Sequence, residues 1–119
     1  MNHTHTDTDL PIENEYPKLV RDNIPTMITS QGRTAQTHIA DDKEYIQFLL
    51  SKLIEEATEL KNADSLDHQK EEIADVREVL ESLLKTLGIS EEEISQVQTS
   101  KALERGGFGG KIILDVKPQ

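Results

Sequence analysis

Two segments of about twenty residues, each with apolar side chains at intervals of three and four, constrain the fold of this chain most strongly. In residues 42–62 one apolar stripe is formed by Ile46, Leu49, Leu50, Leu53, Ala57 and Leu60. In residues 68–87 a second stripe is formed by Ile73, Val76, Leu80, Leu83, Leu84 and Leu87. The connection between them is short and polar. The pattern therefore predicts an all-α fold built on two long antiparallel helices that pack through these stripes.

Shorter elements are expected before and within this hairpin. Asp22 can cap a short helix that has Pro25 in its first turn and ends before Gly32. Residues 34–40 are expected to form a loop or a short strand. Asp41, followed three residues later by a glutamate, is compatible with a capping box at the start of the first long helix.

A third amphipathic helix is expected over residues 91–105, because Ser90 and a glutamate at position 93 form a capping box and two glycines follow. The apolar residues 112–114 could form a short strand or an arm that packs on the body. Residues 1–15 are polar, acidic and without periodicity, so we expect a disordered tail. Residues 16–119 are expected to form a single domain, a bundle of the two long helices and these shorter ones.

Composition excludes several classes of function. With 119 residues, 34% of them apolar and four aromatic, the chain can build one modest aliphatic core. The absence of cysteine excludes disulfides, thiolate zinc sites, iron–sulfur clusters and a cysteine nucleophile. A net charge of −10 disfavours binding to nucleic acid or an anionic membrane. No apolar run reaches transmembrane length and the first residues do not resemble a signal peptide, so we expect a cytoplasmic protein.

Acidic side chains gather beside both apolar stripes. The five carboxylates at these edges belong to Glu55, Glu56, Glu59, Glu72 and Asp75. Lys52 shares the edge of the first long helix with three of them. Antiparallel packing can bring the two acidic edges together, and four or five facing carboxylates would repel one another without a cation. Because all these ligands are oxygen atoms, they favour Mg²⁺, with Mn²⁺ as a possible substitute.

Two other interpretations of these acids stay open. Each group can be an ordinary solvated helix face, or the acids can form structural salt bridges with Lys101 and Arg105. These two cations continue the apolar face that Ile94 and Val97 begin on the third helix. Their position on an expected inward face favours contacts with phosphate. His38 and His68 lie in no motif, so a surface or capping role is expected for both.

The strings KLIEEATEL and EEIADVREVL resemble the EExxE and ExxD signature of the all-α nucleoside triphosphate pyrophosphohydrolase superfamily. That group contains MazG, dimeric dUTPases and phosphoribosyl-ATP pyrophosphohydrolase. The flanking strings YPKLVRDNIP and KALERGGFGGKIIL look like its short MazG-related, phosphoribosyl-ATP-pyrophosphohydrolase-like branch. The resemblance covers residues 16–114 and implies the helical fold of that superfamily.

The resemblance also implies roles for individual residues. By position, it assigns Mg²⁺ ligands to Glu56, Glu59, Glu72 and Asp75. Glu55 would ligate or orient the attacking water. Phosphate oxygens would be held by Lys18, Arg21, Lys52, Lys101 and Arg105. The chain departs from the expected pattern at Asn23, where a lysine is usual.

The activity implied is Mg²⁺-dependent hydrolysis of a nucleoside triphosphate between its α- and β-phosphates, to give a nucleoside monophosphate and pyrophosphate. Such an enzyme could clear surplus or non-standard nucleotides. The alternatives are phosphoribosyl-ATP pyrophosphohydrolase itself and a catalytically silent helical module that binds nucleotide or cation. Because Leu83, Leu84 and Leu87 continue the second stripe beyond the acids, we expect a homodimer or a higher homo-oligomer.

Overall fold

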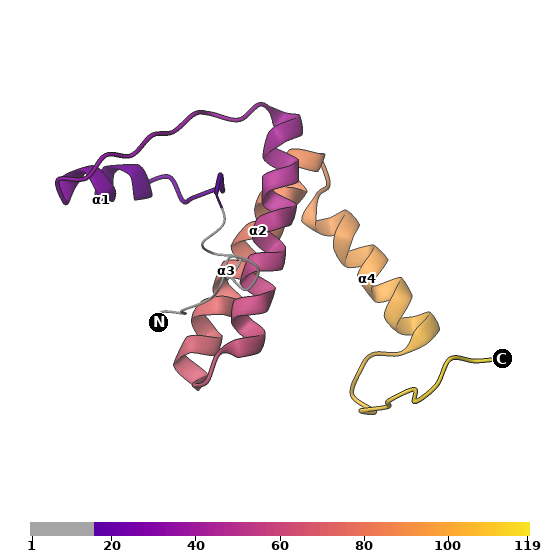
Figure 1. The fold of residues 1–119 in the computed structure, drawn as a ribbon. Helices are drawn as coiled ribbons and strands as arrows, with labels where there is room; N and C mark the ends of the chain where they lie inside the picture. The colour runs from indigo at the N-terminus through magenta and orange to yellow at the C-terminus, as the bar shows by residue number, and fades with distance from the viewer. Residues whose placement is uncertain (1–15) are drawn as a thin grey trace. The chain divides into compact units, whose positions relative to one another are not determined.

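The computed structural model describes residues 16–119, so the tail expected at residues 1–15 lies outside the described residues (Figure 1). The helices are α1 (Ile24–Ser30), α2 (Asp42–Asn62), α3 (Leu66–Leu87) and α4 (Glu91–Arg105). No strand occurs within residues 16–119, which confirms the all-α class. Residues 34–40 and 112–114 are accordingly loop segments.

Helices α2 and α3 lie side by side and antiparallel, as predicted (Figure 1). The α2 helix begins where expected, because the Asp41 carboxylate accepts a hydrogen bond from the Glu44 backbone N–H at 2.8 Å. The α3 helix begins at Leu66, two residues earlier than predicted. Its first turn is stabilised by the Ser65 hydroxyl, which accepts from the His68 N–H at 3.1 Å. The helix ends before Gly88, whose φ of 72° favours glycine.

The residue predicted to cap α1 was wrong. Its N-cap is Asn23 rather than Asp22, and the Asn23 side chain makes no capping hydrogen bond. Pro25 lies in the first turn, where its missing N–H costs nothing, as predicted. The helix ends at Ser30, before Gly32.

A small aliphatic core joins α2 to α3. It is centred on Leu49, Val79 and Leu83, and these are surrounded by the partly buried residues Leu19, Tyr45, Ile46 and Leu53. The stripe predicted for α3 is therefore partly wrong: Val79 turns inward, whereas Ile73, Leu80 and Leu87 remain about half exposed. Glu72 and Asp75 lie on the same face of α3 as Val79 and Leu83, so the face that meets α2 is rotated from the predicted one.

The chain divides into two compact units, one that ends at Leu87 and one formed by Gly88–Gln119. In the second unit, Ser90 and Glu93 form the predicted capping box, with reciprocal bonds of 3.0 and 2.9 Å. No residue of α4 is buried, so the inward stripe expected on this helix is not formed within its own unit. The single domain expected over residues 16–119 stays a prediction.

Within residues 16–119, no helix is a candidate membrane span. None of α1 to α4 combines the length and the apolar character needed to cross a bilayer.

Candidate functional site

The hairpin brings acidic side chains of α2 and α3 to one place. Oxygen atoms of Glu56, Glu72 and Asp75 lie within 4.8 Å of one another, close enough to hold a single cation. Glu56 comes from α2, and the other two are one turn apart on α3. Four of the five acids predicted from the sequence thus belong to two overlapping groups, because Glu59 lies in a second group with Glu72.

Two of these acids are buried. Glu55 and Glu56 are only 6% and 8% exposed, although a charged carboxylate loses hydration when it leaves water. Burial raises the pKa of Glu56 to about 7, and the nearby carboxylates of Glu72 and Asp75 add to this increase. In the absence of a cation, Glu56 is therefore protonated below about pH 7 and ionised above it.

Glu72 has a buried oxygen atom that lacks a hydrogen-bond partner among residues 16–119. This atom, Oε1, exposes less than 1 Å² to solvent. Buried acceptors are nearly always satisfied, so such an atom calls for an explanation. A cation bound between Glu56, Glu72 and Asp75 would satisfy it. The donors are all carboxylate oxygens, so the site fits a hard ion such as Mg²⁺.

Glu55 lies between two lysines. The Nζ atom of Lys52 is 3.5 Å from Glu55 Oε1 and 3.5 Å from Glu56 Oε2. The Nζ atom of Lys18 approaches from the segment before α1, at 3.9 Å from Glu55 Oε2. Both lysine side chains are about 20% exposed. Two of the predicted phosphate-binding lysines are therefore at the acids, with part of each side chain accessible.

Arg21 reaches the other end of the cluster. Its Nη2 atom donates to Asp75 Oδ1 at 2.6 Å, and this hydrogen bond raises the pKa of Arg21 further above its ordinary value. Together with the two lysines, it gives three cationic side chains beside the five predicted carboxylates. The cluster therefore has a net charge of −2 when all these groups are ionised, which favours the binding of cations.

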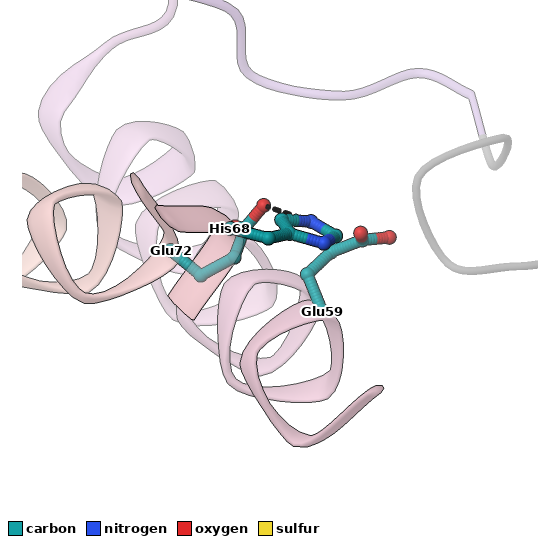
Figure 2. Close-up of side chains that lie close together, drawn as sticks. All are labelled: Glu59, His68 and Glu72. Atoms are coloured by element: carbon teal, nitrogen blue, oxygen red, sulfur yellow. Dashed lines mark ion pairs between the residues drawn. The ribbon is translucent and has the colours of Figure 1, made fainter. Parts of the chain in front are cut away.

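His68 is a member of the site that the sequence analysis did not identify. Its Nε2 atom lies 3.3 Å from Glu72 Oε2, and its ring nitrogen, with oxygens of Glu59 and Glu72, falls within 4.8 Å (Figure 2). The only signal in the sequence is the spacing of four residues between His68 and Glu72, which places both on one face of a helix. By contrast, His38 pairs with Glu44 at 3.1 Å, outside this cluster.

Lys101 and Arg105 belong to the second unit, on α4. Arg105 Nε pairs with Glu104 Oε1 at 3.3 Å on the same helix, and both side chains are largely exposed. Salt bridges do form at the acidic cluster, but their cations are Lys18, Arg21 and Lys52. The assignment of Lys101 and Arg105 to phosphate binding stays a prediction.

Comparison with known proteins gives one partial relative. No family model matches the chain. Over 50 residues it is 46% identical to an uncharacterised protein of Mycolicibacterium smegmatis (strain ATCC 700084 / mc(2)155), covering 42% of this chain and 51% of that protein. The chain thus spans about half the length of this curated relative. No solved structure matches this chain. The superfamily resemblance stays a prediction.

Proposed function

We propose that this protein is a Mg²⁺-dependent nucleotide pyrophosphohydrolase that converts a nucleoside triphosphate to a nucleoside monophosphate and pyrophosphate. The observation that carries the proposal is that buried Glu56 meets Glu72 and Asp75, and that the buried Oε1 atom of Glu72 has no hydrogen bond among residues 16–119. Cationic side chains next to these acids can contact the anionic substrate. We place the activity in the cytoplasm, as the sequence predicts.

In this proposal the acids hold Mg²⁺ and the basic side chains hold phosphate. The ligands are Glu56, Glu59, Glu72 and Asp75, as the resemblance implies. Bound Mg²⁺ would neutralise the charge that develops on the phosphate oxygens. Lys18, Lys52 and Arg21 lie beside the acids and would contact the same oxygens once substrate enters. Lys101 and Arg105 are assigned to this role from the sequence alone.

Glu55 is assigned to the attacking water. It is buried and held between Lys18 and Lys52, so its carboxylate has a fixed position. It would accept a hydrogen bond from the water and orient its oxygen toward the α-phosphorus. As a bond forms between the water oxygen and that phosphorus, the water would give a proton to the Glu55 carboxylate, and the bond from the phosphorus to the bridging oxygen would break. Pyrophosphate leaves, and no Ser, Cys or His nucleophile is needed.

A pyrophosphate-release screen tests this function. The purified protein is incubated with standard and deaminated nucleoside triphosphates and with phosphoribosyl-ATP, each with Mg²⁺ and with EDTA. Release from one or more triphosphates, abolished by EDTA, would support the proposal. Release from phosphoribosyl-ATP and from no other nucleotide would identify a phosphoribosyl-ATP pyrophosphohydrolase. Nucleotide binding without release would indicate a silent module and would contradict the proposal.

Removal of Arg21 is expected to strengthen Mg²⁺ binding in the absence of nucleotide. In the metal-free protein its guanidinium occupies Asp75, a proposed ligand, so the ion must compete with it. Because the pair is partly exposed, the expected gain for Arg21→Ala is modest, about 2- to 5-fold in Kd by calorimetry. Arg33→Ala, an exposed arginine outside the cluster, is the control. Unchanged or weaker Mg²⁺ binding in Arg21→Ala would contradict this competition.

The proposed enzyme is a homodimer or a higher homo-oligomer. Leu83, one of the three residues from which the oligomer was predicted, is buried in the core of the hairpin and needs no partner to cover it. Five other apolar positions are 42% to 59% exposed, namely Leu50, Ile54, Ile73, Leu80 and Leu87. At about 100° per residue, and with α2 antiparallel to α3, they project to one side of the hairpin. The same projection places Glu59 and Asp75 on the other side. A second copy packed on the apolar side would therefore leave the acidic cluster accessible to substrate.

Sedimentation of variants on this side tests the oligomer. We expect the wild type to sediment as a dimer or larger at micromolar concentration. Leu80→Lys should shift it toward monomer, because a charge would be buried at the interface. Ile39→Lys is the control, since Ile39 is 95% exposed in the segment before α2. A wild-type monomer at that concentration, or equal effects of both substitutions, would contradict the proposed interface.

A further inference from the structure

We propose that Glu59, His68 and Glu72 form a second cation position beside the one at Glu56, Glu72 and Asp75, and that its imidazole makes it a site for a transition metal such as Mn²⁺. The inference rests on the proposed function, since Glu72 belongs to both positions and Glu59 is also a proposed Mg²⁺ ligand there. It assigns a ligand role to His68, a residue outside the acidic signature that suggested the enzyme.

Three side chains from two helices converge at this position. Glu59 comes from α2, whereas His68 and Glu72 lie one turn apart on α3 (Figure 2). One ligand atom from each lies within 4.8 Å of the others. The spacing of four residues on one helix is enough to explain the 3.3 Å distance between His68 and Glu72. That spacing does not explain why Glu59, which lies on the neighbouring helix, comes close to the same point.

The carboxylate of Glu72 links this position to the first one. Glu72 is shared by both groups, its side chain is only 12% exposed, and its Oε1 lacks a hydrogen bond among residues 16–119. Pairing with His68 through Oε2 leaves that buried oxygen unsatisfied. Cations on both sides of the carboxylate would use both oxygens. Glu72 would then bridge the two positions.

The other nitrogen of the ring also has a carboxylate nearby. His68 Nδ1 lies 3.9 Å from Asp64 Oδ1. Histidines that bind metal through one nitrogen commonly direct the other N–H toward a carboxylate, which fixes the orientation of the ring. At 3.9 Å the Asp64 carboxylate, which is 94% exposed, lies near Nδ1 without a hydrogen bond. The arrangement leaves Nε2 directed at Glu72 and available as a ligand.

The donor set decides the class of ion. Mg²⁺ prefers oxygen ligands and an octahedral arrangement, whereas imidazole suits transition metals. One ring nitrogen with two carboxylates is a mixed set that Mn²⁺ accepts. We therefore expect the two positions to differ: the all-oxygen group takes Mg²⁺ or Mn²⁺, and the group with His68 favours Mn²⁺.

Mn²⁺ added to the full-length protein without nucleotide tests the inference. Electron paramagnetic resonance counts bound ions, and electron spin-echo modulation detects a ¹⁴N nucleus attached to Mn²⁺. The wild type should bind two ions per chain and show ¹⁴N modulation. His68→Ala should bind one ion per chain and lose the modulation. His38→Ala should behave as the wild type, because His38 also pairs with a glutamate but lies outside the cluster.

The outcomes separate this inference from the proposed function. Mn²⁺ binding without ¹⁴N modulation in the wild type, or modulation that survives in His68→Ala, would overturn the role of His68 and leave the oxygen site intact. No Mn²⁺ binding in any of the three proteins would overturn both. Far-ultraviolet circular dichroism establishes that His68→Ala keeps its helices, so that lost binding reports the ligand rather than unfolding.

Discussion

Glu72→Gln is expected to lower kcat/KM for Mg²⁺-dependent pyrophosphate release on the order of 100-fold or more, with helix content unchanged. Glu72 is the carboxylate common to both groups of ligands, so its loss weakens each of them. The amide keeps the size of the side chain and one oxygen but removes the charge that the ion needs. Initial rates measured across nucleotide concentrations from below KM to saturation, at several Mg²⁺ concentrations, check this expectation.

Glu71→Gln is the matched control, because Glu71 precedes Glu72 on the same helix and is exposed. It should keep most of the wild-type rate. Glu56→Gln, Glu59→Gln and Asp75→Asn should each lose most activity as well. Unaltered turnover in two of these four ligand variants would contradict the metal site, and so would an equal loss in Glu71→Gln.

Glu56→Gln is expected to stabilise the metal-free protein at pH 8 by about 1 to 2 kcal/mol. Folding raises the pKa of Glu56 from its ordinary 4.5 to about 7, so the folded chain binds more protons than the unfolded chain between these values. Stability must therefore fall as pH rises through this window, and the loss is complete above pH 7. A glutamine has no charge to bury, so the stability of the Glu56→Gln variant does not fall in this way as the pH rises.

Urea titrations in EDTA at pH 8 and pH 5 measure the effect. The advantage of Glu56→Gln should be clear at pH 8 and small at pH 5, where Glu56 of the folded wild type is protonated. Added Mg²⁺ should raise the Tm of the wild type and raise that of the variant less. A purely structural role predicts the opposite sign, because Lys52 would lose a partner at 3.5 Å. A destabilised variant that does not respond to Mg²⁺ would contradict the metal site.

The helices were predictable where local signals set them. The bounds of α2 and α4 follow from caps at Asp41 and Ser90, which act on the backbone a few residues away. The hairpin follows from the short connection between two apolar stripes. The rotation of α3 was not predictable, because the periodicity of Ile73 and Leu80 marks an apolar face without showing which neighbour it meets. In the structure that face is half exposed, and Val79 is buried.

The candidate site was predictable as a set of acids, but its detailed contacts were not. Spacing on each helix placed the carboxylates at two edges, and antiparallel packing brought the edges together. The approach of Arg21 to Asp75 joins residues 54 positions apart, and no local pattern encodes such a contact. His68 was missed because a histidine four residues before a glutamate is common on helix surfaces. Its significance depends on Glu59, which comes from another helix.

The most direct test of the central claim is ³¹P nuclear magnetic resonance of the reaction in water enriched in ¹⁸O. The wild-type protein is incubated with Mg²⁺ and a nucleoside triphosphate that it turns over in the release screen. The account predicts a nucleoside monophosphate that carries ¹⁸O on its phosphorus, unlabelled pyrophosphate, and no reaction in EDTA or with Glu72→Gln. Labelled pyrophosphate would contradict attack at the α-phosphorus. A nucleoside diphosphate with orthophosphate, or turnover that persists in EDTA, would contradict the proposed function.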